Sequence, residues 1–222
     1  MKSGAVLGRN VRLGRDCVIE RHAVVGDGAV LGDECLVGAH ASVGPAVELG
    51  ARVVVNPGAR VGGPGFAYAA SSEGHVPLKH VGRCILEDDV EVGSNTTVDR
   101  GSIGDTVVGA GTKIDNLVQI AHNVRIGNRC IIMSQAGLAG STVLEDDVLL
   151  AGQAGLAGHL KIGRGARIAA QAGVIGDVPA GSTYSGYPAR PHREVLRQAA
   201  ALKRLTPLTD SLEQIVEADG SE

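Results

Sequence analysis

The stretch that decides the fold of this 222-residue chain runs from residue 114 to residue 176 and reads IDNLVQIAHNVRIGNRCIIMSQAGLAGSTVLEDDVLLAGQAGLAGHLKIGRGARIAAQAGVIG. An aliphatic residue occurs at every sixth position of this stretch, and a small or β-branched residue usually follows it four positions later. A period of six fits neither an amphipathic helix, which repeats about every 3.6 residues, nor a strand, which alternates about every two. Such repeats predict a coil with three six-residue sides, in which residues 18 apart stack roughly 4.8 Å from each other.

The same period extends through most of the chain. It begins at Leu7, is lost in residues 62–80, shifts by four residues near Arg100–Asp105, and continues to Val174. About 25 hexads are present, enough for a little over eight coils. We therefore predict an all-β fold, a parallel β-helix of hexapeptide repeats with an inserted loop and a short C-terminal helix.

Both repeated positions must point inward, and so narrow a prism leaves no room for aromatic rings. All four aromatic residues indeed lie outside the hexads: Phe66, Tyr68, Tyr184 and Tyr187. The cysteines all occupy the small inward position: Cys17, Cys35, Cys84 and Cys130. We interpret the cysteines as core residues, and not as disulfides, metal ligands or nucleophiles.

Three segments make up the predicted domain organisation. The β-helix occupies residues 1–190, with the insertion loop at 62–80. Residues 191–205 have helical composition and a basic character, and we expect this C-terminal helix to cap the solenoid. Residues 206–222 are acidic and are expected to form a flexible tail.

The composition argues against several classes of function. A net charge of −3 and a charged fraction of 20% indicate neither a nucleic-acid-binding protein nor a disordered chain. No stretch approaches the roughly 18 apolar residues of a transmembrane segment. The first residues lack the apolar region of a secretory signal, so we expect a cytoplasmic protein. Neither a cofactor motif nor a CxxC metal motif is present.

One column of the predicted coils carries a histidine above a run of glycines. The hexad QAGLAG occurs at 135–140 and 153–158 and returns as QAGVIG at 171–176, so the three copies stack. Their last residues, Gly140, Gly158 and Gly176, form a strip without side chains, and His122 takes the same position one coil earlier. His159 lies two coils and one residue beyond His122, roughly 10 Å along the same wall.

This column favours acyl transfer. An imidazole can take a proton from an amine or hydroxyl that attacks a thioester, and a backbone N–H at a glycine can stabilise the resulting oxyanion. We therefore predict His122 as the general base, Gly140 as the oxyanion donor, and an acyl chain along Gly158 and Gly176. No function is assigned to the remaining histidines: His22, His40, His75, His80 and His192.

Several motifs go beyond the hexads and occur in a defined order. They are GFAYA (65–69), NTTVDRG (95–101), KIDNLVQIAHNVRIG (113–127), GLAGST (137–142), GLAGHLKIG (155–163) and YSGYPARPHRE (184–194). From about Val61 to Leu205 the chain resembles the UDP-3-O-(3-hydroxyacyl)glucosamine N-acyltransferases of lipid A biosynthesis. The resemblance implies that the coils of the β-helix are left-handed.

The resemblance also implies roles for individual residues. His122, in IAHN, matches the general base, and Gly140, in GLAGST, matches the oxyanion donor. His159, in GLAGH, matches a second active-site histidine that contacts substrate. The positions that match residues lining the substrate cleft are Asp115, Asn116, Gln119 and Asn123.

The implied reaction moves a 3-hydroxyacyl group from acyl carrier protein to the 2-amine of a UDP-3-O-acyl-glucosamine, without a cofactor. The resemblance further implies a homotrimer with each site between neighbouring chains, and C-terminal helices that help to dock the carrier.

One departure from the family leaves alternatives open. Family members begin with a separate globular domain of about one hundred residues that holds the uracil ring, whereas here the hexads begin at Leu7. The chain is then a truncated member, a partner of a separately encoded domain, or a paralogue that acylates another amino sugar. Two further alternatives remain open: acetyl transfer from coenzyme A, and a structural β-helix without catalytic activity. A zinc enzyme on this fold, which needs two ligand histidines five residues apart and a third, is not favoured.

Overall fold

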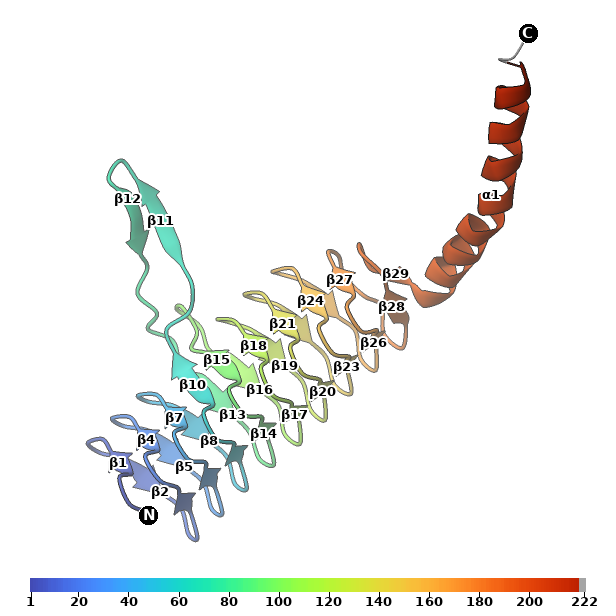
Figure 1. Cartoon of the computed structure of the whole chain (residues 1–222). Helices are drawn as coiled ribbons and strands as arrows, with labels where there is room; N and C mark the ends of the chain where they lie inside the picture. Colours follow the sequence, from blue (N-terminus) through green and yellow to red (C-terminus); the bar gives the residue numbers. More distant parts are fainter. Residues whose placement is uncertain (220–222) are drawn as a thin grey trace.

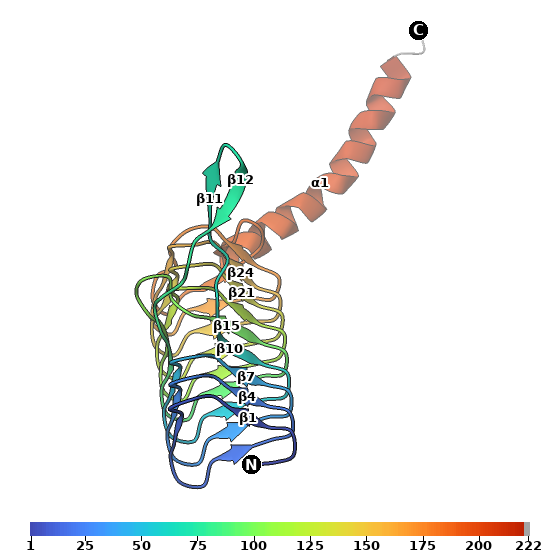
Figure 2. The ribbon, with the colours of Figure 1, turned by 90° about the vertical axis from the view of Figure 1, so that its left-hand side faces the viewer.

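The computed structural model describes the backbone of residues 1–219 and the side chains of residues 1–205. Short parallel strands form a solenoid of stacked coils, from which a hairpin and a long C-terminal helix project (Figure 1). Figure 2 shows the coils lying one above another, beginning at the N-terminus.

Three sheets form the sides of the solenoid. The first sheet contains β1 (Val6–Leu7), β4 (Val24–Val25), β7 (Ser42–Val43), β10 (Arg60–Gly63), β15 (Thr97–Asp99), β18 (Gln119–Ile120), β21 (Gly137–Leu138), β24 (Gly155–Leu156) and β27 (Gly173–Val174). The second sheet contains β2 (Arg12–Leu13), β5 (Val30–Leu31), β8 (Glu48–Leu49), β13 (Cys84–Leu86), β16 (Thr106–Val108), β19 (Arg125–Ile126), β22 (Val143–Leu144) and β25 (Lys161–Ile162). The third sheet contains β3 (Val18–Ile19), β6 (Leu36–Val37), β9 (Val54–Val55), β14 (Glu91–Val92), β17 (Lys113–Ile114), β20 (Ile131–Ile132), β23 (Leu149–Leu150), β26 (Arg167–Ile168), β28 (Thr183–Ser185) and the antiparallel β29 (Arg190–Pro191).

The register between coils is the one that the period of six predicts. Ile132 pairs with Ile114 on one side and with Leu150 on the other, so residues 18 apart stack directly. The two irregularities of the pattern lie beside each other, since the backbone N–H of Val81 donates to the carbonyl of Ser102 at 2.7 Å. The insertion and the four-residue slip therefore lie in one place, and the solenoid is regular elsewhere.

At the corners of the solenoid, residues other than glycine adopt the left-handed backbone conformation. Gln153 has a φ of 61° and His159 a φ of 63°, a conformation that costs most residues about 1 kcal/mol or more. The backbone N–H of Gln153 donates to Ser134 O at 3.0 Å, and that of His159 donates to Gly140 O at 3.0 Å. Hydrogen bonds between coils thus hold the corners in this conformation.

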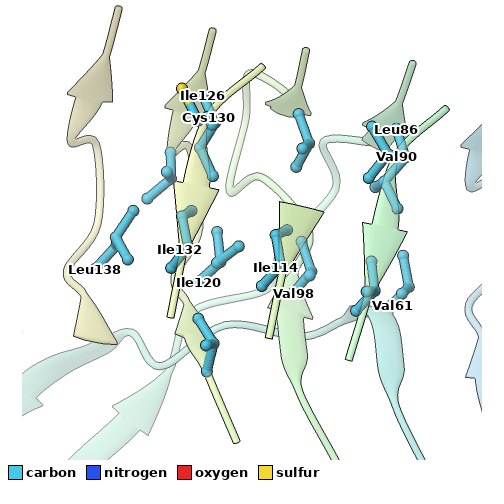
Figure 3. Packing of buried hydrophobic residues seen from close by; sticks show 14 of the residues in the cluster. Val61, Leu86, Val90, Val98, Ile114, Ile120, Ile126, Cys130, Ile132 and Leu138 are labelled. Atoms are coloured by element: carbon cyan, nitrogen blue, oxygen red, sulfur yellow. The ribbon is translucent and has the colours of Figure 1, made fainter. Parts of the chain in front are cut away.

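The core is a single column of aliphatic and small side chains, as predicted (Figure 3). Cys35, Cys84 and Cys130 are buried in it, Cys17 is half-buried, and all four are free thiols. Burial raises the pKa of the Cys84 thiol to about 12, which keeps it protonated and unreactive. The interpretation of the cysteines as core residues is confirmed.

Three features differ from the expectations. The insertion forms an antiparallel hairpin of β11 (Tyr68–Ser71) and β12 (Gly74–Pro77) where a loop was predicted. Tyr184 is not outside the coils: it pairs with Ile168 and packs on the core, where the solenoid ends and a ring has room. The helix α1 (His192–Asp219) continues through most of the expected flexible tail, because residues 208–219 contain neither glycine nor proline, the two residues that disfavour a helix most. Residues 220–222 of that tail lie outside the described residues.

Two neighbouring isoleucines test the inward register. Ile132 is fully buried, whereas Ile131 on the same strand is 45% exposed. Ile132→Ala should lower the free energy of unfolding by about 2–5 kcal/mol, since it leaves a cavity that the stacked coils cannot close. Ile131→Ala should change it by less than about 0.5 kcal/mol. Urea denaturation followed by circular dichroism measures both, and equal losses would contradict the register.

Candidate active site

A cavity of about 1010 Å³ lies on the outer face of the first sheet, where the insertion folds over it. The insertion contributes Gly65, Phe66 and Tyr68 to its wall, and the corner after β18 contributes His122. The floor comes from three stacked glycines on β21, β24 and β27, namely Gly137, Gly155 and Gly173. A cavity of this size beside a histidine is the chain's best candidate for a reaction site.

Two glycines make room for the His122 imidazole. A Cβ atom on Gly140 would lie 2.8 Å from Cε1 of His122, and one on Gly65 would lie 3.0 Å from its Cβ. Real side chains essentially never approach so closely, so the ring lies in contact with both glycine backbones. The next coil on one side and the insertion on the other therefore hold His122 in place.

The amide of Asn123 determines which nitrogen of His122 carries the proton. Its Oδ1 accepts hydrogen bonds from the backbone N–H of Ser102 at 3.0 Å and from the Ser102 hydroxyl at 2.6 Å. Its Nδ2 donates to Gly104 O at 3.1 Å, which fixes the orientation of the amide. Nδ1 of His122 lies 3.0 Å from the same Oδ1, so Nδ1 must be the donor. Neutral His122 consequently presents the lone pair of Nε2.

His80 lies against His122, although no role was predicted for it from the sequence. The two ring centroids are 5.2 Å apart in an edge-to-face arrangement, and His80 is only 7% exposed. Its Nδ1 donates to Leu78 O at 3.1 Å, while its buried Nε2 has no hydrogen-bond partner among the described residues. His80 belongs to the insertion, outside the repeat, so no register could place it beside His122.

Asp99 also lines the cavity, although no role was predicted for it from the sequence. It lines the wall with Thr97 and Gln119, and the Gln119 amide donates to its carboxylate at 2.9 Å. Burial raises the pKa of Asp99 to about 6, against the opposing effects of the Gln119 hydrogen bond and of His122. Gln119, predicted as a cleft residue, does line the cavity, and its side chain also pairs with the Thr97 hydroxyl.

The glycines of the cavity floor are not the ones predicted from the hexads to form the acyl groove. Gly140 lines the cavity, but Gly158 and Gly176 lie at the corners of their coils and do not. A Cβ on Gly137 or Gly155 would meet no atom within 4 Å, which shows that these positions face open space. The glycines that line the cavity therefore lie three residues earlier in each hexad, on the strands. At its far end the ring of Tyr187 lies against Gly173.

Gly140 also keeps a free backbone donor at the cavity wall. Within residues 1–205 its N–H donates no hydrogen bond, although its carbonyl accepts one from His159. An N–H beside the imidazole is available to a developing negative charge.

Of the other predicted substrate residues, Asn123 does not line this cavity but contacts His122, and three lie further away within one chain. Asp115 and Asn116 line a separate recess of about 440 Å³. There their side chains accept backbone hydrogen bonds, Asp115 from Ser134 at 3.1 Å and Asn116 from Ser94 at 2.6 Å. His159 lies at an exposed corner and is not part of the cavity lining.

His75 and His80 are five residues apart, the spacing that a zinc site of this fold would use. His75 lies on β12 with its ring 6.4 Å from that of Tyr68, whereas His80 is buried against His122. Across the described part of the chain, no three His, Cys, Asp or Glu side chains are grouped so as to hold a metal ion. In the same residues, no helix has the length and apolar character needed to cross a membrane.

Residues 28–63 and 105–140 match the model of the bacterial transferase hexapeptide (six repeats). A UDP-3-O-acylglucosamine N-acyltransferase of Granulibacter bethesdensis is 60% identical over 149 residues, which is 67% of this chain and 44% of that protein. The corresponding protein of Methylobacterium sp. (strain 4-46) is 51% identical over 148 residues, 67% of this chain and 42% of that protein. The chain thus spans less than half the length of these curated relatives.

Solved structures agree with the fold. The UDP-N-acetylglucosamine acyltransferase of Francisella novicida superimposes with a TM-score of 0.79 at 23% identity, over 90% of this chain and 73% of that one. The enzyme of Campylobacter jejuni gives 0.76 at 21% identity, over 98% and 90%. This likeness confirms the predicted left-handed hexapeptide β-helix.

Fold and repeat together define a left-handed β-helix of the hexapeptide transferase class. Within that class, the chain is a homologue of the UDP-3-O-acylglucosamine N-acyltransferases over two thirds of its own length.

The tautomer of His122 tests the role of Asn123. Neutral His122 should carry its proton on Nδ1, and Asn123→Ala should shift it toward the Nε2–H form that free imidazoles prefer, because the acceptor is lost. Asn116→Ala, which removes an amide from another corner, should leave the tautomer unchanged. Nitrogen NMR of ¹⁵N-histidine-labelled protein distinguishes the two forms, and an Nε2–H form in the unmodified protein would contradict the assignment.

Proposed function

We propose that this chain is an N-acyltransferase of lipid A biosynthesis. It moves a 3-hydroxyacyl chain from acyl carrier protein to the 2-amine of a UDP-3-O-acyl-glucosamine. The observation that carries the proposal is the position of His122 beside a cavity whose floor is made of stacked glycines. Nε2 of His122 has no hydrogen-bond partner within residues 1–205 and is accessible to solvent. The printed names of the relatives, UDP-3-O-acylglucosamine N-acyltransferase, support the choice of acceptor.

His122 is the proposed general base. Its Nε2 takes a proton from the amine as the amine nitrogen attacks the thioester carbon. The N–H of Gly140 donates to the oxyanion that forms on the carbonyl oxygen. The intermediate then collapses, the C–S bond breaks, and the thiolate takes the proton back from the imidazolium. Asn123 supports both steps because its Oδ1 holds Nδ1–H and leaves Nε2 as the acceptor.

The glycine floor is the proposed track of the acyl chain. Gly137, Gly155 and Gly173 lie on three consecutive coils, so the track spans roughly 10 Å and ends where the Tyr187 ring lies against Gly173. Such a length suits a long chain, whereas an acetyl group needs only a small part of it. This observation favours a long-chain donor over acetyl transfer from coenzyme A.

The proposed partners follow from the same reaction. Acyl carrier protein would dock near the helix α1, whose first part contains Arg193, Arg197 and Lys203. The proposed assembly is a homotrimer, working in the cytoplasm. His159, Asp115 and Asn116 lie outside their own chain's cavity, so as proposed substrate residues they act at the cavity of a neighbouring subunit.

Removing the His122 imidazole tests the function directly. The purified chain is incubated with 3-hydroxyacyl carrier protein and a panel of amino-sugar nucleotides, and the product is detected by mass spectrometry. His122→Ala should lower the transfer rate by about 10²-fold or more while the circular dichroism spectrum stays unchanged.

His40→Ala is the matched control, because His40 lies at an exposed corner stacked on His22, away from the cavity. It should retain full activity. Full activity of His122→Ala, or no transfer to any acceptor by the unmodified chain, would refute the proposal.

A leucine on the cavity floor tests the track. Gly155→Leu should shorten the longest acyl chain that is accepted, since its side chain would enter the open space without a clash. Gly176→Leu, at a corner that also has no atom within 4 Å, should leave the preference unchanged. Rates with carriers of different acyl length measure both variants. A shift with Gly176→Leu alone would place the track along the corners instead.

A further inference from the structure

A second recess, which the function above does not use, adjoins the cavity on the N-terminal side of the insertion. It has a volume of about 690 Å³ and is lined by residues of β7, β10 and β15 and by the end of the insertion that follows β12. Three cationic side chains line it, Arg60, Lys79 and Arg100. We call it the basic recess.

The three cations have no carboxylate partner among the described residues. Arg60 donates to the backbone carbonyl of His40 at 2.8 Å. Arg100 donates to the carbonyls of Gly82 at 2.9 Å and Pro45 at 3.3 Å. These carbonyls orient the guanidinium groups without neutralising them, and Lys79 forms no ion pair within residues 1–205.

The only acidic side chain in the lining of the basic recess is Asp99. Burial raises its pKa to about 6, so at neutral pH Asp99 is still largely ionised and offsets one of the three positive charges. The recess therefore carries an excess of positive charge in a concave site. Arginine and lysine together are suited to phosphate groups, because guanidinium groups bind two oxygens at once and an ammonium group adds a point charge.

The basic recess and the cavity share a wall. Pro64, Thr97 and Asp99 line both of them, so one extended ligand can occupy the two together. The acyl track leaves His122 in the opposite direction, toward β27. A ligand that reaches the basic recess from His122 is consequently the acceptor and not the acyl donor.

We propose that the basic recess binds the diphosphate group of the acceptor nucleotide, held by Arg60, Lys79 and Arg100. The proposal rests on the proposed function in so far as the acceptor is a sugar nucleotide. The single phosphodiester of a phosphopantetheine arm carries too little negative charge to match the three cations. As part of the acyl donor, that arm would also have to lie on the side of His122 where the acyl track runs.

The test measures binding, which does not depend on catalysis. Isothermal titration calorimetry of the full chain uses three probes: pyrophosphate, UDP and 4′-phosphopantetheine. Pyrophosphate and UDP should bind, and the double variant Arg60→Gln/Lys79→Gln should weaken both by at least about tenfold at low salt, where phosphate contacts are strongest. Both side chains are exposed, so the fold should persist, which thermal melting checks.

Arg12→Gln is the matched control, because Arg12 is an exposed arginine on β2 in the second sheet, without an ion pair in residues 1–205. It should bind both probes as the unmodified chain does. Three outcomes would overturn the proposal: no binding of pyrophosphate and UDP, binding that the double variant leaves unchanged, or a loss confined to 4′-phosphopantetheine.

Activity separates this inference from the proposed function. If the unmodified chain transfers acyl groups and the double variant leaves the KM for the sugar nucleotide unchanged, the basic recess is refuted and the function stands. If UDP binds through Arg60 and Lys79 but no acyl transfer occurs, the function is refuted and the recess stands.

Discussion

The hydrogen bonding of each coil to the next is the constraint on which the rest of this structure depends. Because every side has six residues, residue 132 must lie on residue 114 and beneath residue 150, and their side chains must share one narrow core. Aliphatic and small residues fill that core, and the corners accept positive φ angles since their N–H groups bond to the neighbouring coil.

The same stacking builds the candidate site. The ring of His122 has space at its corner because the next coil offers a glycine, Gly140. The four-residue slip then adds Ser102 and Gly104, whose backbone groups orient the Asn123 amide and through it the imidazole. A regular repeat alone would have left this ring without an orienting partner.

The insertion supplies what repeats cannot. Its residues Gly65 and His80 cover His122. It also forms part of the wall between the cavity and the basic recess, and it places Lys79 beside Arg60 and Arg100 in that recess. None of these contacts follows from spacing, because the insertion has no period and its path depends on how it packs against the first sheet. The hairpin and the position of His80 beside His122 could for this reason not be predicted from the sequence.

The sequence by itself determined the coil, the core positions of the cysteines, and the column that joins His122 to Gly140, because a period of six converts distance along the chain directly into position. It did not determine which glycines face the cavity. Gly137, Gly155 and Gly173 do so, and Gly158 and Gly176 do not, since the cavity is defined by where the insertion lies. Only the tertiary structure decided that Asp99 and His80 belong to the site and that Asp115, Asn116 and His159 lie elsewhere. Burial, packing and the direction of a hydrogen bond are properties of the folded chain, and the register does not encode them.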